Sequence, residues 1–273
     1  MPPPDTYQLF LSRGLPDAAG IERLRRDLPE AEWRWITRLQ RADDRRRSLV
    51  GRALIRRLLG RRLGLAPTAV PLGTGLNGKP VLVRHETRYP AHFNLAHSGD
   101  LILAGIGPGP LGVDVEHCPD QVDTALWRQI TGHPSPDARG AAALPSPQAF
   151  CADWVRREAV LKACGLGLTI EPGTLRLSAS GAAGWTTVAG RPEVDGLWVC
   201  LLWADPHDCA ALCLPRAAAS PVAASPVTSS PVAASSAGRP TTCDEPPPDI
   251  WSLRQLTLAD WLDRADRDSG PPT

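Results

Sequence analysis

The chain has 273 residues, of which 42% are hydrophobic and 22% charged, and its formal net charge is +1. A chain of this length can bury one large core or two modest ones, and this composition is typical of soluble globular proteins. The near-neutral charge argues against a nucleic-acid-coating or polybasic membrane protein. No apolar run approaches the roughly 18 to 20 residues of a membrane span. We therefore expect neither nucleic acid nor membrane as a partner.

Apolar spacing in the first part of the chain predicts a strand, helices and a group of strands. A strand is predicted at Tyr7–Leu11, a helix in Asp17–Leu28, and two further helices within Glu30–Leu63. Four more strands are predicted at Val81–Arg84, His92–Ala96, Leu101–Ile106 and Leu111–Glu116. The segment GPGP at 107–110 indicates a boundary between two halves.

The second part of the chain also contains predicted helices and strands, separated by longer irregular segments. A short helix is predicted at Thr124–Ile130, and a long helix at Gln148–Cys164 ends at the Gly165 and Gly167 pair. Strands that would complete an antiparallel sheet are predicted at Thr174–Leu177, Trp185–Val188, Leu197–Trp203 and Cys209–Leu214. Tandem Ser-Pro-Val repeats give the next segment the composition of a linker. The patterned tail beyond it favours docking back on the body, with a partner peptide as the alternative.

Seven cysteines are scattered along the chain without a C-x-x-C pair. The N-terminus MPPPDTYQ lacks the charged and then apolar pattern of a secretory signal. We therefore expect a cytoplasmic protein whose thiols stay reduced and pack as small core side chains. His207, Cys209 and Cys213 could bind a metal, but a packed strand with chance thiols is the favoured interpretation.

The stretch GVDVEH at 112–117 places two carboxylates on one face of a predicted strand. Because side chains alternate along a strand, Val113 and Val115 point one way, while Asp114 and Glu116 point the other, about 7 Å apart. Such anions suit Mg²⁺, which binds a few protein carboxylates together with phosphate and water. A D-x-E tripeptide is common, however, so a solvent-facing strand is the favoured interpretation of this motif alone.

The stretch REAVLKACG at 157–165 contains Lys162, one of only two lysines, whereas the other 28 basic residues are arginines. Helical spacing places Glu158 and Lys162 one turn apart on the same side. As a surface pair they would contribute a few tenths of a kcal/mol, and arginine would serve as well. An amine can release its proton whereas a guanidinium stays charged. The composition therefore favours a chemical role for Lys162.

Two further motifs complete a pattern. Asn-Gly-Lys-Pro at 77–80 predicts a tight turn that presents Lys79 outward, and HFNLAHSGD at 92–100 predicts a strand with His97 at its end. Taken alone, each motif favours a structural interpretation: a hairpin turn with a solvent-exposed lysine, and a hydrogen-bonded structural histidine. Together with the carboxylates they are the parts needed for Mg²⁺-assisted phosphoryl-group transfer. The absence of a Walker A loop, a G-x-G-x-x-G or a kinase motif set argues against ordinary nucleotide folds.

The ordered series NGKP, HFNLAHSGD, LGVDVEH and WVRREAVLKACGLGL resembles the Sfp-type 4′-phosphopantetheinyl transferases. Their signatures are a G-K-P turn, an F-N-x-S-H-S block, a G-[IV]-D-[IV]-E strand and a W-x-x-K-E-A-x-x-K helix. Order and spacing agree from roughly Ala42 to Leu214. The resemblance implies transfer of the 4′-phosphopantetheine arm of coenzyme A to a serine of an apo acyl or peptidyl carrier protein, a transient partner, with release of 3′,5′-ADP.

The resemblance also implies a fold and its division. The expected fold is α+β: a pseudo-twofold pair of similar α/β subdomains with mainly antiparallel sheets, and coenzyme A bound in the cleft between them. The expected units are a coenzyme A-binding subdomain at 1–108, a subdomain with the metal strand and catalytic helix at 109–215, a disordered linker at 216–248 and a tail at 249–273. Because two halves supply one cleft, a monomer would suffice.

Residue roles follow from the same resemblance. Mg²⁺, or alternatively Mn²⁺, would be held by Asp114, Glu116 and Glu158 and would bridge to the pyrophosphate of coenzyme A. Lys162 would lie by that pyrophosphate and steady or protonate the departing 3′,5′-ADP. The group that deprotonates the acceptor serine stays open, with Glu158 or a metal-bound water as the leading candidates.

Four cationic or titratable residues would contact coenzyme A. His97 would meet a phosphate, while Lys79 and Arg47 would serve the adenosine or 3′-phosphate end. Arg157, the fourth, replaces the usual first lysine of the helix motif and keeps its charge but not its titratable amine.

Other departures are Val155, where Ser or Thr is usual, and Ala96, which replaces the serine before His97. A glutamate that many members carry after the metal strand has only Asp137 near its place. These departures support an alternative, a degenerate member that binds coenzyme A or a carrier without transfer. Hydrolysis of a coenzyme-like pyrophosphate is a weaker third possibility. Fatty-acid, polyketide, nonribosomal-peptide and lysine-pathway carriers all stay open as acceptors.

Overall fold

The computed structural model describes residues 6–75, 80–83, 91–132, 144–178, 184–215 and 251–257. The first half contains β1 (Tyr7–Arg13), α1 (Ala18–Arg25), α2 (Glu30–Thr37), α3 (Ala42–Leu63), β2 (Leu72–Thr74), β3 (Pro80–Leu82), β4 (His92–Ser98) and β5 (Leu101–Gly107). The remainder contains β6 (Gly112–His117), α4 (Thr124–Thr131), α5 (Pro147–Cys164), β7 (Arg176–Leu177), β8 (Trp185–Ala189), β9 (Leu197–Ala204), β10 (Asp208–Pro215) and β11 (Trp251–Thr257). Single 3-10 turns lie at Pro67–Ala69, Gly167–Thr169, Pro172–Thr174 and Pro192–Val194.

The strands form two main sheets and one small hairpin. The first sheet has the order β11-β1-β5-β4, in which β1 pairs in parallel with β11 and antiparallel with β5. The second sheet has the order β6-β10-β9-β8-β7 and is antiparallel throughout. Strands β2 and β3 form the hairpin. The structure therefore confirms the expected α+β class with mainly antiparallel sheets.

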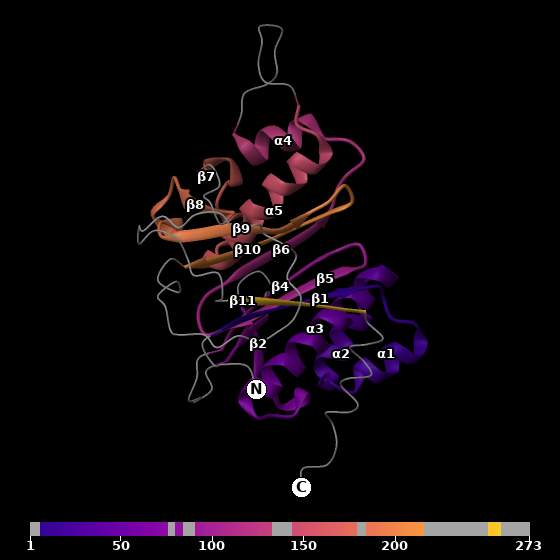
Figure 1. Ribbon diagram of the computed structural model, residues 1–273. Helices are drawn as coiled ribbons and strands as arrows, with labels where there is room; N and C mark the ends of the chain where they lie inside the picture. The colour runs from indigo at the N-terminus through magenta and orange to yellow at the C-terminus, as the bar shows by residue number, and fades with distance from the viewer. Residues whose placement is uncertain are drawn as a thin grey trace, which may run out of the picture.

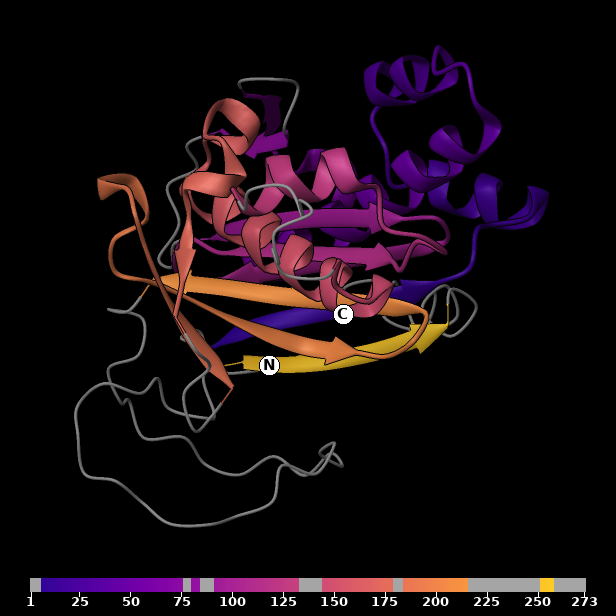
Figure 2. The same ribbon diagram turned by 90° about the horizontal axis from the view of Figure 1, so that it is seen from above.

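Four layers result, in the order helices, sheet, sheet, helices (Figures 1 and 2). Alternating side chains of β1 explain this order, because Phe10 packs with helices α1 to α3 whereas Leu9 and Leu11 enter the core between the sheets. Strand β10 divides its side chains in the same way between the first sheet and α5. Removal of these apolar faces from water is the main force that holds the layers together.

Helix α5, which carries part of the candidate site, has clear local signals at both ends. Ser146 caps it, with its Oγ accepting a hydrogen bond from the N–H of Ala149 at 3.1 Å, and Pro147 occupies the first helical position. Gly165 ends the helix in the left-handed conformation, with φ at 76°. These signals fix the register of the WVRREAVLK motif relative to the sheet.

Strands β4 and β6 lie side by side where the two main sheets meet, although they belong to different sheets. Side chains of β4 bind the backbone of β6. The N–H of Val113 donates to Oδ1 of Asn94 at 3.2 Å, and the N–H of His117 donates to Oγ of Ser98 at 3.1 Å. Asn94 is only 1% exposed. These two bonds join the first half of the chain to the second half beside the motif residues.

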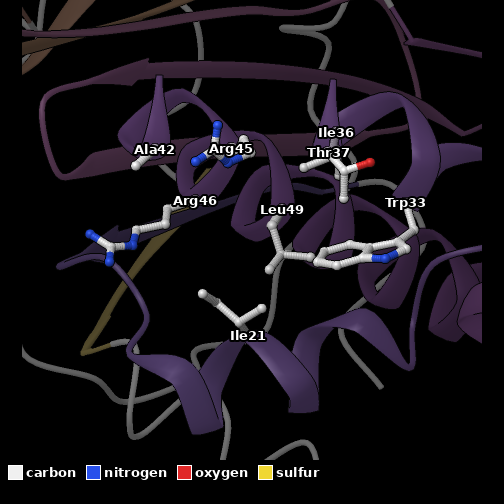
Figure 3. Close-up of a pocket in the computed structure, with 8 residues that line it drawn as sticks. All are labelled: Ile21, Trp33, Ile36, Thr37, Ala42, Arg45, Arg46 and Leu49. Atoms are coloured by element: carbon white, nitrogen blue, oxygen red, sulfur yellow. The ribbon is translucent and has the colours of Figure 1, made fainter. Parts of the chain in front are cut away.

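A pocket of about 340 Å³ lies among α1, α2 and α3 (Figure 3). Trp33 forms one end of it, and Arg45 and Arg46 lie at the other. Arg45 is engaged by the protein itself, because its Nη1 donates to the carbonyls of Leu39 and Gln40 at 2.7 and 2.9 Å. The residues that line this pocket lie outside the motifs of β4, β6 and α5. No helix in the described ranges is both long and apolar enough to cross a membrane.

The sequence-based elements agree closely with the structure. The predicted division of residues 30–63 into two helices is confirmed by α2 and α3. Strand β2, three residues long, was not predicted because so short a segment carries no periodic signal. The start of the tail forms β11 beside β1, whereas residues 216–248 and the tail after Thr257 lie outside the described residues. The division at residue 108 stays a prediction.

Candidate functional site

Strand β6 presents one face to α5 and the other to the core between the sheets. Val113 and Val115 are fully buried in that core, as the alternation predicts. Asp114 points toward α5 and is only 2% exposed, so the solvent-facing interpretation of this strand is wrong. Gly112 allows this close packing, because a Cβ there would lie 1.8 Å from the carbonyl oxygen of Ala159 in α5.

Helix α5 places an acid and an amine against the buried aspartate. Nζ of Lys162 lies 2.5 Å from Oδ1 of Asp114, which makes a charge-assisted hydrogen bond between α5 and β6. The other aspartate oxygen, Oδ2, is buried without a hydrogen-bond partner, and so is Oε1 of Glu158. Two buried anionic oxygens without partners are costly unless a cation or a donor from outside the chain satisfies them.

The electrostatics of the cluster point the same way. The pKa of Asp114 is raised to about 7, mainly by burial; Lys162 opposes this shift, and the anions Glu116 and Glu158 add to it. Burial also raises the pKa of Glu158, with Lys162 opposing and Glu116 adding to the shift. Three carboxylates therefore act on one another, and a single lysine compensates them only in part.

Two residues of the first half approach this cluster. The side chain of His97, at the end of β4, reaches solvent. Partial desolvation lowers the pKa of His97, the charges of Lys162 and Arg47 lower it further, and Glu116 opposes them. Arg47 of α3 donates from Nη1 to the carbonyl of Gly99 at 2.9 Å, in the turn that follows β4. The structure thus brings Arg47 and His97 to the same seam as the carboxylates.

Arg157 lies apart from the carboxylate cluster, and its expected contact with coenzyme A stays a prediction. Its side chain is buried, with Nε donating to Asp153 at 2.8 Å and Nη1 donating to the carbonyls of Pro172 and Leu175 at 2.7 and 2.9 Å. These partners hold α5 against the segment that leads into β7. Arg157 is therefore a structural residue, because helical spacing turns it away from the side that Glu158 and Lys162 share.

Replacing Arg157 with methionine is expected to lower the free energy of unfolding by about 3 kcal/mol, because two buried carbonyls and Asp153 lose their partner. Chemical denaturation measures this loss, and coenzyme A affinity should stay unchanged. Arg176→Met, at an exposed arginine of β7, is the control and should cost less than about 0.5 kcal/mol. Weakened coenzyme A binding at unchanged stability would show that Arg157 faces the ligand.

The other departures from the family pattern also lie in the core. Val155 is fully buried in the core between α5 and the second sheet, and Ala96 is 3% exposed in the core between the sheets. Neither side chain faces the carboxylate cluster. Lys79 and Asp137 lie outside the described residues, so the expected role of Lys79 at the adenosine or 3′-phosphate end stays a prediction.

Two residues that position the site were missed. Asn94 stands in the HFNLAHSGD motif, but its bond to Val113 depends on a meeting of two sheets that a single motif does not reveal. Gly112 stands in LGVDVEH, where a glycine inside a strand signals close approach of another backbone. That signal was available in the sequence, and it marks the contact between β6 and α5.

The donor set suits a hard divalent cation. Carboxylate oxygens are the ligands that Mg²⁺ prefers, and two of those in the cluster are buried without a partner. Among the described residues, however, the oxygens of Asp114, Glu116 and Glu158 do not all lie within 4.8 Å of one another. A modest rotation of side chains would have to accompany cation binding, and Asp114 would then exchange part of its contact with Lys162.

Known proteins resemble this chain over parts of its length. A family profile described as "4′-phosphopantetheinyl transferase, N-terminal" matches residues 15–106. The 4′-phosphopantetheinyl transferase psf-1 of Bacillus pumilus is 33% identical over 143 residues, or 51% of this chain and 60% of that protein. A 4′-phosphopantetheinyl transferase of Bacillus subtilis is 29% identical over 166 residues, or 60% of this chain and 71% of that protein.

The 4′-phosphopantetheinyl transferase Sfp of Bacillus subtilis strain 168 is 30% identical over 79 residues, or 29% of this chain and 34% of that protein. Over these segments the chain is similar to the Sfp-type 4′-phosphopantetheinyl transferases. The matched segments span between about a third and 71% of these relatives' own lengths. In this chain, the motif residues of β4, β6 and α5 converge on the seam between the two sheets.

Proposed function

We propose that the protein transfers the 4′-phosphopantetheine arm of coenzyme A to a serine hydroxyl of an apo acyl or peptidyl carrier protein. One observation carries this proposal. Asp114 Oδ2 and Glu158 Oε1 are buried beside Lys162 without a hydrogen-bond partner, as expected of a site that binds a cation and a diphosphate. Similarity to 4′-phosphopantetheinyl transferases supports the same reaction.

In the proposed reaction the serine oxygen attacks the phosphorus that bears the pantetheine arm. A new P–O bond forms to serine, and the P–O bond to the 3′,5′-ADP moiety breaks. The serine proton passes to a base, for which Glu158 is the leading candidate; burial raises the pKa of this carboxyl above its usual value, which makes it a stronger base. Lys162 then steadies or protonates the departing phosphate, and His97 and Arg47 bind coenzyme A phosphates from the side of the first half.

Asp114, Glu116 and Glu158 would hold Mg²⁺, which when bound neutralises charge on the pyrophosphate. The chain's own contribution is the close packing of β6 on α5, which keeps the carboxylates and Lys162 together, with Asp114 almost completely buried and the others partly buried. The acceptor serine comes from the carrier protein. A transient 1:1 encounter of a monomer with the carrier would be sufficient.

Intact-mass spectrometry of apo carriers tests the proposal. Purified protein, coenzyme A and Mg²⁺ are incubated with fatty-acid, polyketide, nonribosomal-peptide and lysine-pathway carriers. The expected product is a carrier heavier by one phosphopantetheine, and chelation of the metal should prevent its formation. If all four carrier classes stay unmodified, the transferase proposal fails.

A non-catalytic coenzyme A- or carrier-binding role is the alternative. Its sequence support came from Arg157, Val155 and Ala96, and each of these side chains is buried in packing contacts away from the carboxylate cluster. That placement weakens the alternative. Calorimetric coenzyme A binding together with zero turnover on the carrier panel would favour it over transfer.

Lys162→Arg is expected to lower the rate of transfer by at least about 10²-fold, because a guanidinium keeps its charge but cannot supply a proton. Coenzyme A affinity should change much less, since the positive charge beside Asp114 is retained. Single-turnover kinetics and calorimetry separate the two effects. Arg176→Lys, on an exposed residue of β7, is the control. Near-normal turnover in Lys162→Arg would exclude proton donation by this amine.

Mg²⁺ binding should strengthen as the pH rises through about 7, because protonated Asp114 is a poor ligand. The raised pKa means that the folded protein keeps a proton that the unfolded chain releases above about pH 4. Without metal, this group's contribution to stability therefore falls as the pH rises from about 4 to 7. The Mg²⁺-induced increase in Tm should be larger at pH 8 than at pH 6. An equal or larger increase at pH 6 would contradict this assignment.

A further inference from the structure

Three cysteines from separate parts of the chain meet at the C-terminal end of β6. Cys118 follows β6, Cys151 lies in the first turns of α5, and Cys209 lies in β10. Their sulfur atoms all lie within 4.8 Å of one another, and the sulfurs of Cys118 and Cys209 are 3.7 Å apart. Cys151 and Cys209 are almost completely buried, whereas Cys118 is half-buried.

The spacing fits a single metal ion. A tetrahedral site with metal–sulfur bonds of about 2.3 Å places its sulfurs about 3.8 Å apart, and a trigonal site places them about 4.0 Å apart. Thiolate is the ligand class that selects Zn²⁺ and Cu⁺ over hard cations. Cys118 also gives the site a side that solvent can reach, so a fourth ligand from solvent has access.

The backbone around the cluster is already ordered. The N–H of Cys118 donates to the carbonyl of His207 at 2.7 Å, which fixes the chain after β6 against the turn before β10. The thiol of Cys151 donates to the carbonyl of Glu116 at 3.7 Å, and the thiol of Cys209 donates to the carbonyl of Gln148 at 3.8 Å. These hydrogen bonds help to hold the three sulfurs near one another.

Charged groups of both signs lie near the cluster: the carboxylates of Asp205 and Asp208 disfavour a thiolate at Cys209, whereas Arg156 favours it. The guanidinium of Arg156, on α5, interacts with Cys209, and its Nε is buried without a hydrogen-bond partner. One Zn²⁺ bound by three thiolates carries one net negative charge, which the positive Arg156 would neutralise. A buried charge is tolerated far better when it is paired in this way.

We propose that Cys118, Cys151 and Cys209 form a thiolate site for one soft d¹⁰ cation, Zn²⁺ or Cu⁺. Each thiol that binds releases its proton to solvent, and no oxidation is involved. The bound ion ties the end of β6 to α5 and β10, the same elements that carry Asp114 and Lys162. It acts as a clamp beside the carboxylate cluster and takes no part in phosphopantetheine transfer.

Cobalt spectroscopy on the full-length, reduced protein tests the site. Co²⁺ titration should give one equivalent of sulfur-to-cobalt charge-transfer absorption, which carboxylate ligands do not produce, and Zn²⁺ should displace it. A parallel anaerobic titration with Cu⁺ decides which ion binds more tightly. Zn²⁺ should also raise Tm by several degrees. Asp114→Asn should keep the absorption, so the result does not depend on the transferase proposal.

Cys118→Ser should lower Co²⁺ affinity by about 100-fold or more. Because Cys118 is half-buried, this variant should fold even if serine at the two buried positions does not. Cys164→Ser, at a half-buried cysteine outside the cluster, should leave the titration unchanged. Absence of the absorption in fully reduced protein would overturn the proposal, and so would an unchanged affinity in Cys118→Ser. Formation of a Cys118–Cys209 disulfide in preference to metal binding would also overturn it.

Discussion

Asp114→Asn is expected to reduce carrier modification by at least about 10²-fold while the protein stays folded. The change keeps the size of the side chain but removes the anionic oxygen that lies buried without a partner, Oδ2. Loss of outer-shell partners of a metal ligand already costs about 10- to 100-fold, so loss of the ligand's charge should cost at least as much. Intact-mass assays at saturating coenzyme A and Mg²⁺ measure the effect.

Lys162 makes the outcome of this substitution informative. In Asp114→Asn the ammonium of Lys162 loses the charged partner 2.5 Å away, but it still has the carboxylate of Glu158 nearby. Because the lysine keeps an anionic neighbour, the protein should lose little stability. Asp120→Asn, on an exposed carboxylate of the same segment, is the matched control and should transfer at the normal rate. If Asp114→Asn kept normal activity at low Mg²⁺, Asp114 could not be a ligand.

Gly112→Ala is expected to cost about 3 kcal/mol or more and to lower Tm by about 10 °C. A Cβ at this position would lie 1.8 Å from the carbonyl oxygen of Ala159 and 2.6 Å from the amide nitrogen of Ala163. Both atoms belong to the backbone of α5, so no side-chain rotation relieves the clash. Strand and helix must separate, and activity should fall because Asp114 then moves away from Glu158 and Lys162.

Gly51→Ala is the matched control for this packing argument. Its added methyl would meet the end of the Leu95 side chain at 2.7 Å, which can shift, and alanine favours the helical conformation of α3 by about 1 kcal/mol. Thermal unfolding should therefore show a change of less than about 1 kcal/mol for Gly51→Ala. Equal effects of the two substitutions would mean that β6 does not rest on the backbone of α5.

The periodicity of apolar residues was sufficient to predict most strands and helices, because burial on one face repeats every two residues in a strand and about every three to four in a helix. The two valines of β6 predicted its buried face. The spacing of Glu158 and Lys162, about one helical turn, predicted that they share a side of α5. The rarity of lysine added a chemical argument for Lys162. The contact between Lys162 and Asp114 joins residues 48 positions apart and depended on how the elements pack.

Arg157 shows what a motif leaves open. Its position in the helix motif suggested a ligand contact, but in the structure its partners are Asp153 of α5 and the carbonyls of Pro172 and Leu175, which the sequence did not indicate. The cysteines show that a candidate site can also be invisible in the sequence. Residues 118, 151 and 209 have no metal-binding spacing along the chain, and only the packing of β6, α5 and β10 brings their sulfurs together.

Strand β11 has a practical consequence for shortened versions of the protein. It pairs in parallel with β1 along the whole of that strand, from Tyr7 beside Trp251 to Arg13 beside Thr257. Truncation at Pro215 would leave β1 with a bare row of amide and carbonyl groups, which is a template for pairing with other molecules. A trimmed protein would be prone to aggregate, even though every motif residue of the active site remained in place.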